Sequence, residues 1–121
     1  MREILFRGKR VDKDAWVHGD LCRVIDGDVQ APFILHHRIF YGRVIPESIG
    51  QFTGLYDSAG NKIFEGDILV FDGAENKQDE RAAVVFDDGK FKLKYFKYSY
   101  LDDLDSSIAK MQTVVGNVYD Q

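Results

Sequence analysis

A run of alternating lysines and aromatic residues, Lys90-Phe91-Lys92-Leu93-Lys94-Tyr95-Phe96-Lys97-Tyr98, has the composition of a nucleic-acid-binding strand. In a strand, every second side chain points to the same face, so alternate lysines would line one face. Phe96 breaks the alternation, and a bulge could place its ring beside the lysines. Basic residues with an exposed ring can hold a single strand of nucleic acid by charge and stacking. The candidate nucleic-acid-binding residues are Lys90, Lys92, Lys94, Phe96 and Lys97.

The alternative for this run is an amphipathic strand whose lysines are solvated and discourage pairing at a sheet edge. The formal net charge of the chain is −4 at pH 7. Because this overall charge opposes attraction to phosphate, it favours the alternative without excluding a local basic patch.

The histidines and the single cysteine are the second group with possible chemistry, because zinc accepts both as ligands. They are His18, Cys22, His36 and His37. Adjacent histidines in a strand point to opposite faces, and four residues of strand separate His18 from Cys22 by about 13 Å. The spacing therefore predicts no metal site.

Three aspartates near the C-terminus, Asp102, Asp103 and Asp105, could attract a divalent cation, but their spacing fits no calcium loop. Acidic side chains in the first turn of a helix interact favourably with the helix dipole. This structural role is the preferred interpretation.

Signatures of a catalytic nucleophile are missing from the sequence. There is no Gly-x-Ser-x-Gly motif, and Cys22 has no evident base in the sequence pattern. Glu65 and Asp67 would share a face of a regular strand, which alone does not establish acid–base catalysis. We therefore predict no enzymatic activity, no catalytic residues and no cofactor, with a site hidden from sequence as the alternative.

Period-two patterns and turn residues dominate the N-terminal half. They predict strands over residues 2–7, 15–25 and 28–37, with Asp26-Gly27 as the turn of a hairpin. Pro32 restricts the third strand to an edge or a bulge. Residues 38–50 are expected to be irregular.

In the C-terminal half, strands are predicted over residues 51–56, 63–71, 81–87, 90–98 and 112–119. A turn at residues 57–60, a bend at Gly66-Asp67 and a hairpin turn at Asp88-Gly89 connect them. Leu101, Leu104 and Ile108 recur at helical spacing, and Ser99 with Asp102 resembles a capping box. The pattern therefore predicts a short helix within residues 99–110.

The 121 residues, with 45% hydrophobic and 30% charged side chains, are typical of one globular domain, here residues 1–121. A single cysteine forms no internal disulfide, and no segment is apolar enough for a signal peptide or a membrane span. These features predict a cytoplasmic protein that does not enter a membrane. Many short strands indicate a mainly β fold.

Three stretches of the sequence resemble the YopX family of bacteriophage and prophage proteins. They are residues 1–7, residues 44–57 continuing through 60–68, and residues 114–119. The resemblance implies an SH3-like barrel core with additional antiparallel strands, a phage or prophage origin and a bacterial cytoplasm. It implies no catalytic residues.

The motif residues themselves have a structural interpretation: glycines supply turns and bends, and short polar side chains cap the backbone. The positions concerned are Gly54, Gly60, Gly66, Asp67, Gly116 and Asn117.

Two functions from different classes remain open besides a hidden enzyme. The first is a phage accessory protein that binds another protein or itself, because aromatic residues often anchor interfaces. Its candidate anchors are Trp16, Phe40, Tyr41, Phe96 and Tyr98. The second is a nucleic-acid-binding module that uses the basic run 90–98.

Overall fold

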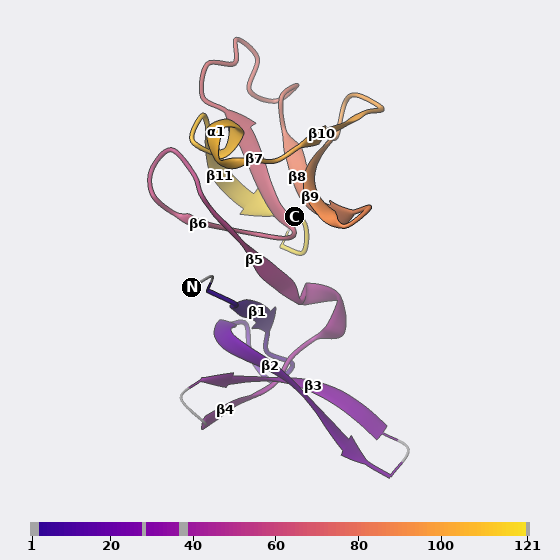
Figure 1. The fold of residues 1–121 in the computed structure, drawn as a ribbon. Coiled ribbons are helices and arrows are strands. Elements are labelled where there is room, and N and C mark those ends of the chain that lie inside the picture. The colour runs from indigo at the N-terminus through magenta and orange to yellow at the C-terminus, as the bar shows by residue number, and fades with distance from the viewer. Residues whose placement is uncertain (1–2, 28, 37–38, 121) are drawn as a thin grey trace. The chain divides into compact units, whose positions relative to one another are not determined.

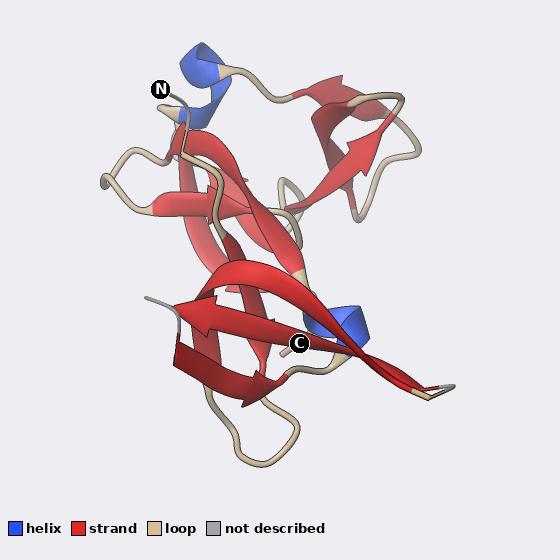
Figure 2. Cartoon of the chain, turned by 60° about the horizontal axis from the view of Figure 1, so that its bottom comes forward, coloured by secondary structure: helices blue, strands red, loops and turns tan. Residues whose placement is uncertain are grey.

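The computed structural model describes residues 3–27, 29–36 and 39–120, with the backbone alone for 26, 29 and 39–41. The chain forms two compact units, Met1–Phe52 and Thr53–Gln121. Strands account for most of the regular structure in both units (Figure 1, Figure 2). The prediction of a mainly β protein is therefore confirmed. Within the described residues, no helix has the length and apolar character needed to cross a membrane.

The first unit is an antiparallel sheet in the order β4-β3-β2-β1-β5. Its elements are β1 (Phe6–Lys9), β2 (Trp16–Asp26), β3 (Val29–His36), β4 (Ile39–Arg43), the 3-10 helix η1 (Pro46–Ser48) and the start of β5 (Gly50–Tyr56). The first strand begins at Phe6, later than the strand predicted over residues 2–7. Residues 3–5 have no regular structure, although the Leu5 carbonyl accepts a hydrogen bond from the Phe52 amide.

The hairpin of β2 and β3 forms where the Asp-Gly turn predicted it, and its register pairs Asp26 with Val29. Gly27 has φ 61°, which suits a tight hairpin turn. Pro32 lies in β3, an interior strand, and not at a sheet edge. The register of β3 against β4 shifts between Phe33 and Leu35, so the irregularity expected from proline falls just beyond it.

Residues 38–50 were expected to be irregular, which is wrong for most of this segment. β4 and η1 occupy it, and η1 begins at Pro46, where a proline is tolerated because the first turn needs no amide donor. The buried Ser48 hydroxyl donates to the Ile45 carbonyl over 2.6 Å and accepts from the Lys9 amide over 2.8 Å. A side-chain hydroxyl thus connects η1 to β1, a tertiary contact that local pattern does not reveal.

The second unit contains a five-stranded antiparallel sheet in the order β10-β9-β8-β7-β11. Its elements are the end of β5, β6 (Lys62–Phe64), β7 (Asp67–Phe71), β8 (Ala82–Asp87), β9 (Lys90–Tyr95), β10 (Leu101–Asp103), the helix α1 (Ser106–Ala109) and β11 (Gln112–Asn117). Strands β7 to β10 form a meander, and the last strand returns to pair with β7 (Figure 1).

The core of this unit lies on one face of the five-stranded sheet. Leu69, Val84 and Leu93 come from β7, β8 and β9, and each is at most 1% exposed. Ile63 from β6 and Ala109 from α1 complete the cluster from outside the sheet. Burying such side chains is the main source of stability in a domain of this size.

The family resemblance implied an SH3-like barrel, but the described strands do not form a closed barrel. Among the described residues, the strands form two antiparallel sheets, and β10 and β11 stand at opposite ends of the five-stranded one. Closure requires the two edge strands to pair, and alternating side chains specify a buried face without specifying which edges meet.

The predicted helix at residues 99–110 is wrong over its first half. Residues 101–103 form β10, and α1 covers only residues 106–109. Asp105, not Ser99, is the N-cap, and its carboxylate accepts from the Ile108 amide over 2.9 Å. Asp102 and Asp103 therefore lie in a strand, since pairing with β9 overrides a local helical pattern.

Candidate functional site

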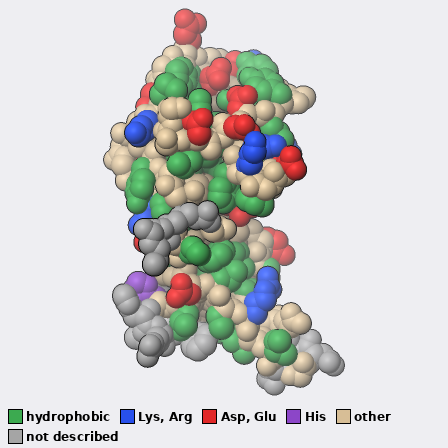
Figure 3. All heavy atoms as spheres, in the orientation of Figure 1, with side chains coloured by type: hydrophobic (Ala, Val, Ile, Leu, Met, Phe, Trp, Pro, Cys, Tyr) green, Lys and Arg blue, Asp and Glu red, His purple; other side chains and the backbone are tan. Residues whose placement is uncertain are grey.

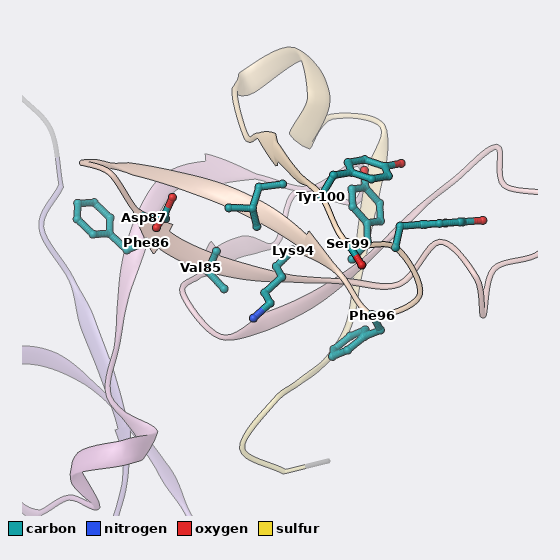
Figure 4. Close-up of a pocket in the computed structure, with 10 residues that line it drawn as sticks. Val85, Phe86, Asp87, Lys94, Phe96, Ser99 and Tyr100 are labelled. Carbon is teal, nitrogen blue, oxygen red and sulfur yellow. The ribbon is translucent and has the colours of Figure 1, made fainter.

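A groove with an aromatic lining lies on the five-stranded sheet of the second unit (Figure 4). Its volume is about 590 Å³, within the range of ligand pockets. The rings that line it are Phe86, Tyr95, Phe96, Tyr98 and Tyr100. We call this pocket the aromatic groove.

Side chains of strand β9 alternate between the core face and the groove face of the five-stranded sheet. Leu93 is 1% exposed and packs in the core, whereas the next residue, Lys94, is exposed and lines the aromatic groove. In Figure 4, Lys94 extends between Val85 and Phe96, while Phe86 and Asp87 lie at the far end of β8. The period-two alternation of a strand thus separates core from groove within two consecutive residues.

Phe96 follows directly after β9 and is 46% exposed. Its amide donates to the Arg81 carbonyl over 3.1 Å, and the Arg81 guanidinium carbon lies 5.1 Å from its ring centroid. The contact has cation–π geometry. Phe96 is on the groove face by its regular two-residue spacing from Lys94, because the described register of β9 against β8 contains no shift, and the bulge suggested by the sequence is not needed.

Three tyrosines form a contiguous cluster in the groove. The ring centroid of Tyr100 lies 5.1 Å from that of Tyr95 and 5.9 Å from that of Tyr98. The Tyr95 hydroxyl donates to the Asp102 carboxylate over 3.0 Å. Burial, together with this hydrogen bond to a carboxylate, raises the pKa of Tyr95, so the hydroxyl stays protonated and remains a donor.

The five residues predicted to bind nucleic acid do not converge. Lys94 and Phe96 line the aromatic groove, but Lys90, Lys92 and Lys97 do not. Instead, these three ammonium groups lie 3.7, 3.1 and 2.8 Å from the carboxylates of Asp103, Asp87 and Asp79, respectively. The hydrogen bond to Asp79 raises the pKa of Lys97. The positive charge of the run is therefore largely balanced by neighbouring aspartates.

A buried carboxylate fastens the turn after β5 to the last strand. Asp57, 4% exposed, accepts from the amides of Ala59 and Asn61 and, across the fold, from the amide of Val114 over 3.0 Å. Burial opposes ionisation of this group, but the hydrogen bonds outweigh it and lower its pKa. This geometry gives Asp57 a structural role.

Of the motif glycines, Gly60 and Gly66 lie at turns, whereas Gly54 lies within β5 and not at a turn. Gly54, Gly60 and Gly66 have φ of 84°, 83° and 91°. At Gly66, this left-handed backbone lets the chain turn between β6 and β7, and a side chain would be strained there. Asp67 is buried and accepts from the Phe64 amide over 2.7 Å.

The last two motif residues lie near the end of β11. Gly116 follows a register shift between β11 and β7, and Asn117 pairs with Asp67. The Asn117 side chain also exchanges hydrogen bonds with Asp120 over 2.8 and 3.2 Å.

The candidate metal ligands do not form a cluster in the part of the chain that the structure describes, where no three His, Cys, Asp or Glu side chains come together. His18 and Cys22 lie four residues apart on β2, and His36 ends β3. His37 lies outside the described residues. Glu65 lies in the turn before β7, so it is not on a regular strand with the buried Asp67.

The candidate interface aromatics fall in both units. Trp16 is half-buried, and the guanidinium carbon of Arg7 lies 5.0 Å from its ring centroid. The side chains of Phe40 and Tyr41 lie outside the described part of the structure. Phe96 and Tyr98 line the aromatic groove. Figure 3 shows hydrophobic side chains among charged ones on the face that it draws.

Sequence reasoning missed Phe86 and Tyr100 as groove residues and Asp57 as a buried carboxylate. Phe86 precedes a hairpin turn and pairs with Phe91 across it, and this aromatic cross-strand pair could have been read from the hairpin register. Tyr100 follows the basic run by two residues, and its ring contacts are with Tyr95 and Tyr98 of that run. Asp57 depends on its contact with Val114, and no local signal marked that contact.

The structure thus defines a mainly β protein with two antiparallel sheets and an aromatic groove on one of them. The family model described as YopX protein matches residues 5–121. Because this match covers nearly the whole sequence, the chain belongs to the YopX family.

A solved structure shares this fold. The crystal structure of protein EF1440 from Enterococcus faecalis aligns with a TM-score of 0.61 and 20% sequence identity, covering 99% of this chain and 96% of that one. At this identity, the likeness concerns the fold alone. None of the curated protein sequences matches this chain.

Proposed function

We propose that the chain is a non-catalytic protein-binding module whose aromatic groove receives part of another protein. The observation that carries this proposal is the gathering of exposed rings in one groove: Phe86, Phe96 and Tyr100 are 55%, 46% and 52% exposed. Exposed aromatic side chains are enriched at protein interfaces because they bury a large area when a partner covers them.

Charge favours a protein partner over nucleic acid. Three lysines of the run 90–98 are matched by aspartates, and the whole chain carries −4. Affinity for nucleic acid comes mainly from neutralising several phosphates, which a surface with balanced charge does poorly. Nucleic-acid binding stays the alternative, supported by the stacked tyrosines beside Lys94.

The buried carboxylates support a non-catalytic role. Asp57 and Asp67 both accept hydrogen bonds from backbone amides, so their charge stabilises turns. A general acid or base needs a carboxyl group that can reach a substrate.

Three further features belong to this proposal. The order of β7 to β11, a meander whose last strand returns to its first, supports an SH3-like arrangement of the second unit. The YopX family supports a phage or prophage accessory protein that works in the bacterial cytoplasm. Self-association through the same exposed rings is the other form that protein binding could take.

Selection from a random peptide display library tests the proposal. The bait is the full chain, and each selected peptide is measured again with the double variant Tyr98→Ala/Tyr100→Ala. A matched control is Tyr119→Ala, an exposed tyrosine that does not line the groove. We expect peptides that lose binding only with the double variant.

Two results would overturn the proposal: no enriched peptides together with a strict monomer in sedimentation, or peptides that bind the double variant as well as the wild type. A mobility shift of oligothymidylate at low salt, abolished by Lys94→Glu, would instead establish the nucleic-acid alternative.

A further inference from the structure

The aromatic groove lies on a sheet face where backbone groups are already paired. Strands β8 and β9 pair from Ala82 with Tyr95 to Asp87 with Lys90, and β9 also pairs with β10. An occupant lying over β8 and β9 therefore finds few free backbone donors or acceptors there, as β-strand addition would require. Over these strands, recognition depends on side chains, above all on the faces of the rings.

Two of the tyrosines that line the groove are exposed. Tyr98 and Tyr100 are 39% and 52% exposed, and neither hydroxyl has a hydrogen-bond partner among the described residues. Tyr95 beneath them is held by Asp102 and packs against the core. The groove thus offers flat apolar faces together with hydrogen-bond donors on a well-supported base, and rigid tyrosines lose little conformational entropy on binding.

A polyproline II segment has the complementary chemistry. Its backbone makes no internal hydrogen bonds, so its carbonyl oxygens are free to accept. Proline has no amide hydrogen and therefore needs no acceptor from the groove. Its ring packs on aromatic faces, and its conformation is largely formed before binding, which lowers the entropic cost.

The charge of the groove adds a second requirement on the segment that binds there. Lys94 is exposed and has no ion-pair partner among the described residues, unlike Lys90, Lys92 and Lys97. One available ammonium group suits a single carboxylate and is too little for a chain of phosphates.

We propose, building on the protein-binding function above, that the aromatic groove binds a proline-rich segment of a partner protein. The segment lies in the polyproline II conformation, and one of its acidic side chains reaches Lys94. The free hydroxyls of Tyr98 and Tyr100 donate to its carbonyl oxygens.

Fluorescein-labelled peptides test this by anisotropy with the full chain. The probes are an oligoproline peptide with one central glutamate, the same peptide with lysine at that position, and a glycine–serine peptide with one glutamate. We expect the glutamate oligoproline to bind, the lysine version to bind about two- to fivefold more weakly, and the glycine–serine peptide not to bind. Amide chemical shifts should change at residues 94–101.

Variants distinguish the contribution of the tyrosine rings to peptide binding from the contributions of their hydroxyl groups and of the charge of Lys94. Tyr98→Phe/Tyr100→Phe keeps the rings and should weaken binding by about tenfold, as expected for the loss of two hydrogen bonds. Lys94→Glu should reverse the preference, so that the lysine peptide becomes the tighter ligand. Lys110→Glu, an exposed lysine outside the groove, is the control and should change neither preference.

Equal binding of the glycine–serine and oligoproline peptides would overturn the proposal, as would an unchanged preference in Lys94→Glu. Tighter binding of oligothymidylate than of any peptide would also overturn it. If display selection yields groove-dependent peptides without proline, the protein-binding function stands and this inference fails. If no peptide depends on the groove, both fail.

Discussion

The two faces of the five-stranded sheet carry equally apolar residues but treat them differently. On the packed face, Val84 and Leu93 are 1% exposed beneath β6 and α1. On the groove face, Leu101 of β10 and Phe96, which follows β9, are 42% and 46% exposed. The difference shows that composition does not decide burial. A side chain is buried when another element of the chain covers it, and exposed rings that nothing covers mark the surface available to a partner.

The largest expected effect is on the packed face. Leu93→Ala removes a fully buried side chain and should lower the free energy of unfolding by about 2–5 kcal/mol. Its matched control is Leu101→Ala, the same substitution at a residue that is 42% exposed and lines the groove. We expect a change within about 0.5 kcal/mol there, measured by urea denaturation. Equal losses in the two variants would contradict the division into two faces.

The next effect concerns the turn that joins β5 to β6. Strand β6 contributes Ile63 to the core on the packed face. Asp57→Ala leaves the amides of Asn61 and Val114, in two partly buried hydrogen bonds, without their acceptor, which should cost about 1–3 kcal/mol of unfolding free energy. Asp103→Ala, at an exposed aspartate of β10, serves as the control in the same denaturation experiment. A loss no greater than that of the control would remove the structural role of Asp57.

Acid should weaken the same turn. The folded-state pKa of Asp57 lies below its ordinary value of 3.8, so its contribution to stability is present above about pH 4. It is lost as the pH falls through the lowered folded-state pKa. Denaturation midpoints measured from neutral pH to about pH 2 should fall less steeply in Asp57→Asn than in the wild type. Parallel curves would show that other carboxylates account for the acid dependence.

A smaller effect is expected at the start of α1, the helix that brings Ala109 into the core. Asp105→Ala removes the carboxylate that accepts from the Ile108 amide. Because α1 is only one turn long, the loss of its cap should lower the melting temperature less than Asp57→Ala does. Asp105→Asn keeps a capping oxygen and should restore most of the difference. No rescue by asparagine would argue against the cap.

The smallest effect should come from the groove. Lys94→Glu changes an exposed side chain and should alter the unfolding free energy by less than about 0.5 kcal/mol. Lys92 lies two residues away on the same strand, pairs with Asp87, and has a side chain that is only 16% exposed. Lys92→Glu removes this ion pair. It should be clearly more destabilising in calorimetry. The reverse order would mean that Lys94 has a structural role.

Much of the fold could be predicted from local pattern. The hairpins at Asp26-Gly27 and Asp88-Gly89 form as expected, since Asp-Gly suits a tight turn between alternating strands. The bend at Gly66 also lies between β6 and β7, as predicted. The predicted helix is wrong at residues 101–103 because these residues pair with β9, and this pairing between segments overrides the short helical pattern.

The candidate site was predicted only in part. The sequence singled out Lys94, Phe96 and Tyr98 in one run, and all three line the groove. It also grouped Lys92 and Lys97 with them, because the aspartates that balance those lysines are five and 18 residues away in the chain. Such partners are identified only when the fold brings them into contact.

By itself, the sequence determined the mainly β character, most strand positions, the Asp-Gly turns and the family, because these depend on short-range alternation and on motifs. Tertiary structure alone decided which face each strand buries and that Asp57 reaches Val114. It also decided that the edges of the five-stranded sheet find no partner strand in the described part of the chain. It also gathered the rings of β8 and of the segment after β9 into one groove. The physical reason is that burial and pairing are properties of contacts between distant segments, which a local pattern does not contain.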